Sequence, residues 1–84
     1  MSDVDRLRKV FRAALGLADE VDVDGLEYQS IDRWDSLAHM TLVAAIEDEF
    51  DVMIDTDDVL TMSSFTKARE LLERLGAWAT RGGA

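Results

Sequence analysis

The sequence has no cysteine and only one histidine among its 84 residues. Without cysteine there is no disulfide, no thiol nucleophile and no cysteine-held zinc site or iron–sulfur cluster, and one histidine does not make a multi-histidine metal site. No apolar run approaches the ~20 residues of a membrane span, and the first residues lack the basic-then-apolar order of a signal peptide. We therefore expect a cytoplasmic protein that folds without disulfides.

The chain is also short for a protein with a built-in active site. With 48% hydrophobic and 32% charged residues, it has enough apolar material for one small packed domain. Most enzyme folds that enclose a substrate pocket need a longer chain. We therefore expect a non-catalytic, monomeric protein on which other proteins act.

Negative charge is concentrated in the middle of the chain. Residues 17–66 hold fourteen acidic residues against Arg33 alone, whereas residues 1–16 and 67–84 each carry a net charge of +2. Such a surface repels the phosphates of nucleic acids and attracts partners with basic surfaces. A solvated acidic surface with no recognition role is the other interpretation of the same residues.

Apolar residues recur at helical spacing in three long stretches, which predicts an all-α fold. The expected helices cover residues 4–15, 37–50 and 65–75, with stops at Gly16 and Gly76 and a cap for the last helix at Ser63 or Ser64. A brief fourth helix follows a cap at Asp55 or Thr56. Residues 17–35 show no period and predict a long irregular loop. Its isolated apolar residues are expected to pack against the helices: Leu17, Val21, Leu26, Tyr28, Ile31 and Trp34.

The expected second helix has an apolar arc too wide for one neighbour. Leu37, Met40 and Val43 form one stripe, and Ile46 and Phe50 belong to another beside it. Such a helix is typical of the central member of a bundle. The sequence therefore predicts a four-helix bundle over residues 1–76, in which all these side chains pack in the core. Residues 77–84 are expected to form a flexible tail, from which Trp78 alone has reason to fold back on the bundle.

Ser36 lies between Asp35 and Leu37, where the long loop ends and the second helix begins. The first amide groups of a helix are unpaired and its dipole is positive at this end, so a phosphate ester on this hydroxyl would be stabilised. An ordinary helix cap formed by Ser36 or Asp35 is the plainer alternative, and position alone favours it.

The residues around Ser36 form a pattern that is evidence beyond the location of this serine at the start of a helix. It runs Trp34-Asp35-Ser36-Leu37, then Val43, then Ile46-Glu47-Asp48-Glu49-Phe50, then Val52-x-Ile54-x-x-Asp57-Asp58-Val59. Over most of its length the chain thus resembles the acyl carrier protein family. The resemblance implies a four-helix bundle in which a phosphopantetheinyl transferase attaches 4′-phosphopantetheine, taken from coenzyme A, to Ser36. The thiol of this arm would hold acyl or aminoacyl groups as thioesters.

The resemblance also implies a surface for loading and acyl-processing enzymes that carry basic residues. The expected partner-binding residues are Asp35, Leu37, His39, Met40, Glu47 and Asp48. For the acids, a solvated helix face is an equal alternative. Many fatty-acid carriers have an acid about five residues after the modified serine, where this chain has Thr41. We therefore expect a dedicated pathway, which leaves polyketide, other secondary-metabolite, fatty-acid and surface-polysaccharide assembly open.

Four alternatives stand beside this interpretation. Trp34 is also typical of D-alanyl carriers, and an unmodified acidic interaction module of the same fold explains the charge equally well. His39 is spaced to act as a base for Ser36, but the pattern offers no third orienting group, so a hydrolase is not expected. Residues 20–25 imitate a calcium-binding loop, yet the twelfth position is Ile31 where a bidentate Glu is needed.

Overall fold

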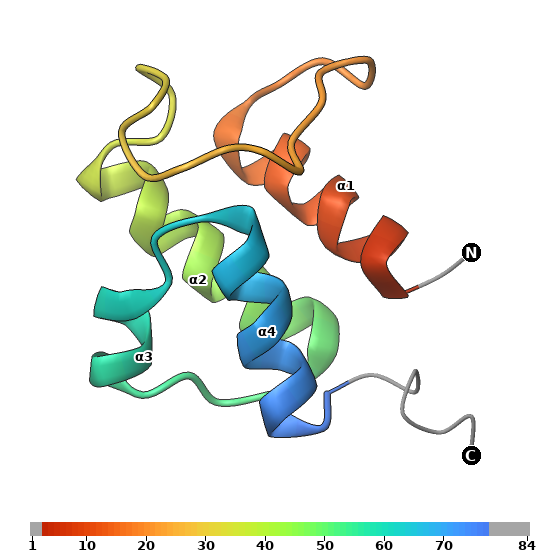
Figure 1. Ribbon diagram of the computed structural model, residues 1–84, viewed down its shortest axis with the longest axis vertical. Coiled ribbons are helices and arrows are strands. Elements are labelled where there is room, and N and C mark those ends of the chain that lie inside the picture. The colour runs from red at the N-terminus through yellow and green to blue at the C-terminus, as the bar shows by residue number, and fades with distance from the viewer. Residues whose placement is uncertain (1–2, 78–84) are drawn as a thin grey trace.

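The computed structural model describes residues 3–77 and consists of four helices (Figure 1). The helices are α1 (Asp3–Leu15), α2 (Ser36–Phe50), α3 (Thr56–Thr61) and α4 (Phe65–Leu75). Within residues 3–77 there is no strand, only an isolated antiparallel bridge between Glu27 and Ser64. The predicted all-α bundle of three longer helices and a short one is confirmed. No helix of residues 3–77 combines the length and the apolar character that a bilayer crossing needs.

The helix ends follow the local signals in the sequence. Gly16 and Gly76 adopt the left-handed conformation, with φ of 68° and 69°, and end α1 and α4. Asp35 and Ser64 cap α2 and α4, each through a side-chain oxygen that accepts the amide N–H of the third helical residue. Of the predicted tail, residues 78–84 lie outside the described part of the chain. Ala77 still packs partly buried against the core.

Three aromatic rings join the elements at the centre of the core. The Phe11 ring of α1 meets the Trp34 ring of the long loop edge to face at 5.4 Å and the Phe65 ring of α4 at 5.0 Å. All three side chains are almost completely buried. Edge-to-face pairs of this kind add about 0.5–1.5 kcal/mol beyond the burial of their area. In Figure 1, α3 lies at the side of the molecule opposite α1.

The prediction that Leu37 and Met40 pack in the core is wrong. Their side chains are 78% and 57% exposed, whereas Val43, Ile46 and Phe50 on the same helix are buried. Ile46 follows Leu37 by nine residues, and at about 100° per residue the two lie on opposite sides of α2. The wide apolar arc is therefore two separate faces, of which only one packs in the bundle.

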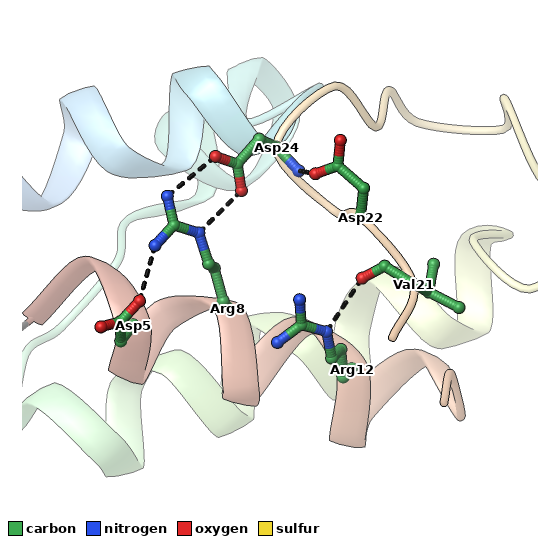
Figure 2. A network of polar contacts seen from close by, with 6 residues as sticks. All are labelled: Asp5, Arg8, Arg12, Val21, Asp22 and Asp24. Atoms are coloured by element: carbon green, nitrogen blue, oxygen red, sulfur yellow. Dashed lines mark hydrogen bonds and ion pairs between the residues drawn. The ribbon is translucent and has the colours of Figure 1, made fainter. Parts of the chain in front are cut away.

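The loop of residues 16–35 arches over one end of the bundle and is irregular, as predicted (Figure 1). Figure 2 shows how α1 holds it: the Arg8 guanidinium donates to both carboxylate oxygens of Asp24, each at 2.8 Å, and Arg12 Nε donates to the Val21 carbonyl at 3.0 Å. Val23 lies between these contacts and is fully buried, which was not predicted from the sequence. The predicted contacts with the core are confirmed for Leu17, Leu26, Tyr28, Ile31 and Trp34.

Candidate functional site

Ser36 is the first residue of α2, and its side chain is exposed. The cap of this helix is Asp35, whose backbone is extended, with φ of −102° and ψ of −172°. Its Oδ1 accepts the Ala38 N–H at 2.9 Å, and its carbonyl accepts the His39 N–H at 2.8 Å. Because Asp35 does the capping, the Ser36 hydroxyl is not committed to the helix.

The surroundings of Ser36 suit an anionic ester. Within residues 3–77, the amide N–H groups of Ser36 and Leu37 have no hydrogen-bond partner, as is usual for the first turn of a helix. The positive end of the helix dipole lies at the same place. The residues present therefore fit a phosphodiester on Ser36, which is the linkage of a phosphopantetheine arm.

Tyr28 contacts Ser36 directly. Its hydroxyl lies 3.0 Å from Ser36 Oγ, and either oxygen is able to donate. The sequence predicted Tyr28 only as a loop residue packed on the helices. The single available signal was that the hydroxyl of a half-buried tyrosine usually has a hydrogen-bond partner.

His39 is bonded within the chain through both ring nitrogens. The indole N–H of Trp34 donates to Nδ1 at 3.0 Å, so the ring proton is on Nε2, which donates to the Val59 carbonyl at 2.9 Å. These bonds join α2 to the loop and to α3. His39 therefore has no free nitrogen to offer either to Ser36 or to a partner protein, and the hydroxyl that contacts Ser36 is that of Tyr28.

The predicted partner-binding residues separate into two groups. Asp35, Leu37 and Met40 are exposed on the first turns of α2, and Asp48 is exposed further along the side of the helix that carries Leu37. Glu47 is half-buried, and its carboxylate accepts the Ile54 amide at 2.8 Å, so it holds the chain after α2.

A small pocket adjoins the site. It has a volume of about 120 Å³ and is lined by Tyr28, His39, Val59, Leu60, Met62 and Ser63. A larger hollow of about 210 Å³ lies between α3 and α4, but charged side chains such as Asp58, Lys67 and Glu70 line it and neither Ser36 nor Tyr28 does. The pocket at Tyr28 is therefore lined by a residue that contacts the Ser36 hydroxyl, although Ser36 itself does not line it.

The acidic loop at residues 20–25 serves to hold the fold. The two carboxylate oxygens of Asp24 bind the Arg8 guanidinium, and this hydrogen bonding lowers the pKa of Asp24 below its usual value. Asp22 accepts the amide N–H of Asp24 at 3.1 Å. Within residues 3–77, no group of three or more histidine or acidic side chains is placed to hold a metal ion.

No protein-family model, no curated protein and no solved structure matches this chain. The functional interpretation therefore depends on the geometry around Ser36 and on the pattern of residues that surrounds it.

Proposed function

We propose that this protein is a carrier. Ser36 takes a 4′-phosphopantetheine arm from coenzyme A, and the thiol of the arm holds acyl or aminoacyl groups as thioesters for partner enzymes. The observation that carries the proposal is the exposed hydroxyl at the first residue of α2, which takes no part in capping the helix because Asp35 does so. The resemblance of residues 34–59 to acyl carrier proteins supports it.

The chain depends on an external enzyme for the attachment. A serine hydroxyl is a weak nucleophile at neutral pH unless a base removes its proton. His39, which the sequence spacing offers as a base, has both nitrogens engaged with Trp34 and Val59. A phosphopantetheinyl transferase with Mg²⁺ therefore supplies the base. The Oγ–P bond of Ser36 forms, the bond from that phosphorus to the nucleotide part of coenzyme A breaks, and the hydroxyl proton passes to the transferase.

The surface around Ser36 suits brief contacts with such enzymes. Leu37 and Met40 offer an apolar area next to the hydroxyl, and the exposed carboxylates of Asp35 and Asp48 lie on the same helix. An apolar patch on a partner, bordered by basic residues, would complement them. The area is small, which suits a shuttle that has to dissociate quickly from each partner.

The size of the neighbouring pocket favours a small cargo. Its volume of about 120 Å³ is well below the ~300–1,000 Å³ of pockets that enclose a drug-sized ligand. A short acyl or aminoacyl group would fit there, whereas a long fatty acyl chain would remain largely on the surface. Within the proposal, a short polyketide extender unit and an amino acid such as D-alanine are therefore favoured.

Intact-mass spectrometry tests the proposal. The protein is incubated with coenzyme A, Mg²⁺ and a broad-specificity phosphopantetheinyl transferase, and we expect a mass gain equal to one arm. Ser36→Ala should show no gain, and because the Ser36 side chain is exposed, its circular dichroism spectrum should match the parent. Thr66→Ala removes an exposed hydroxyl near the start of α4 and should be modified like the parent.

The opposite result would favour a different function. No mass gain with several transferases would contradict the carrier proposal. The exposure of Leu37 and Met40 does not depend on a modification, so the protein would then be an unmodified acidic interaction module that uses the same end of α2.

A further inference from the structure

Tyr28 belongs to the loop of residues 16–35 and is brought to Ser36 by the fold. The two residues are eight positions apart in the sequence, yet their hydroxyl oxygens are 3.0 Å apart. The carrier proposal needs only Ser36, so this second hydroxyl requires an explanation of its own.

The backbone on both sides of Tyr28 is fixed. Its N–H donates to the Ser63 carbonyl at 2.8 Å, next to the bridge between Glu27 and Ser64. Gln29 follows in the left-handed conformation, with φ of 65°, and its N–H donates to the Trp34 carbonyl at 3.0 Å. A left-handed conformation is unfavourable for a residue with a side chain, by about 1–2 kcal/mol. The turn that returns the chain from Tyr28 to the start of α2 is thus maintained at some cost.

The Tyr28 ring is held as firmly as its backbone. It meets the His39 ring edge to face at 5.2 Å and the Trp34 ring at 6.2 Å. Trp34 is fully buried, and His39 is bonded through both nitrogens. The two rings leave the hydroxyl at the edge of the packed cluster, against Ser36 Oγ.

We propose that Tyr28 is a positioning residue for Ser36 and for the phosphodiester formed on it. This inference rests on the proposed carrier function. Before the transfer, the Tyr28 O–H donates to Ser36 Oγ and fixes its rotamer, which leaves the proton of Ser36 free for the base of the transferase. Afterwards, the ester oxygen of Ser36 is a weak acceptor, and the Tyr28 O–H donates to a non-bridging phosphate oxygen in a charge-assisted bond. Tyr28 keeps its own proton throughout, and the arm starts beside the pocket lined by Tyr28 and His39.

Tyr28→Phe is the decisive variant, because it keeps the ring and removes only the hydroxyl. The first measurement is the steady-state rate of transfer to the unmodified protein. Loss of one hydrogen bond should lower kcat/KM about three- to tenfold. The second measurement is the ³¹P NMR spectrum of the modified protein. In the variant we expect the phosphodiester resonance to shift and to become narrower, because the phosphate loses a fixed donor.

Thr61→Val is the matched control. It also removes one hydroxyl, which in the parent is bonded to the Asp58 carbonyl on α3, and both measurements should match the parent. Circular dichroism and thermal melting establish that Tyr28→Phe is folded before the comparison. An unchanged kcat/KM together with an unchanged ³¹P resonance in Tyr28→Phe would overturn the role of Tyr28, although Ser36 is modified. Absence of any transfer to the parent protein would overturn the carrier function itself.

Discussion

Two surfaces of the molecule use their side chains in opposite ways. On the first, Arg6 and Arg8 of α1 each bond to two acids: Arg6 to Asp3 and Glu49, and Arg8 to Asp5 and Asp24. We call this the anchored face. The second surface, which we call the open face, consists of Ser36, Leu37, Met40 and Asp48, all exposed on α2.

The difference shows how one acidic protein can be held together and still offer a charged surface to partners. On the anchored face the carboxylates are neutralised within the chain, and each ion pair connects α1 to another element or to its own first turn. On the open face, Asp48 forms no ion pair with any residue from 3 to 77. An unpaired surface charge beside exposed apolar groups remains available to a second molecule.

The largest expected effect is the loss of stability caused by a substitution on the buried side of α2. Phe50 is buried, and the Arg6 guanidinium lies 4.7 Å above its ring. Phe50→Ala should lower the free energy of unfolding by about 3–5 kcal/mol. For a domain of this size, with a stability of about 5 kcal/mol, that change comes close to unfolding the protein. Denaturant titration followed by circular dichroism measures it.

Leu37→Ala is the control on the same helix. Because the Leu37 side chain is 78% exposed, its removal should change the free energy of unfolding by less than about 0.5 kcal/mol. Equal losses in the two variants would mean that the two sides of α2 do not differ as described.

The exposure of Leu37 shows a feature that could not be predicted from the sequence alone, namely which side of α2 is covered by its neighbours. Apolar spacing, caps and glycine stops act within a few residues, so the helices and their ends are predictable from the sequence. Apolar residues occur on all sides of the expected second helix, however, and periodicity does not tell which side its neighbours cover. The prediction placed Leu37 and Met40 in the core for this reason, whereas Ser36 at the helix start followed from local signals.

The long loop was predictable as a loop, but its contacts were not. Val21 and Val23 alternate with Asp22 and Asp24, yet only Val23 is fully buried, and so short an alternation does not tell the two valines apart. The contact of Tyr28 with Ser36 depends on Gln29 in the left-handed conformation and on hydrogen bonds to residues far along the chain. Such contacts arise only when the helices have assembled.

An intermediate effect should distinguish two adjacent acids. Glu47 accepts the Ile54 amide, whereas Asp48 is exposed. Glu47→Ala leaves a partly buried N–H without its acceptor and should lower the free energy of unfolding by about 1–3 kcal/mol. Asp48→Ala should leave it within about 0.5 kcal/mol of the parent. The measurement is again denaturant titration.

The two acids should also differ in their importance for loading. Asp48→Lys should slow loading by the cognate enzyme, and the loss should be larger at low ionic strength, since salt screens the attraction between exposed charges. Loading rates of Asp48→Lys that equal the parent at low salt would show that Asp48 is only a solvated residue. Glu47→Gln keeps a carbonyl acceptor for Ile54 and serves as the folded comparison.

The smallest expected effect concerns the anchored face and pH. The Arg8 guanidinium holds the pKa of Asp24 below its usual value in the folded protein, so the unfolded chain takes up this proton at a higher pH. The ion pair therefore stabilises the fold at neutral pH, and this stabilisation is lost as the pH falls through the lowered pKa of Asp24.

The Asp24 side chain is 44% exposed, so solvent limits the contribution to less than about 1 kcal/mol. Asp24→Asn should reduce the difference in unfolding free energy between pH 7 and pH 3 by up to that amount, whereas Glu20→Gln, on the same loop and exposed, should leave it as in the parent. If both variants lose stability in acid as steeply as the parent, the tether between Arg8 and Asp24 does not distinguish the anchored face from the open one.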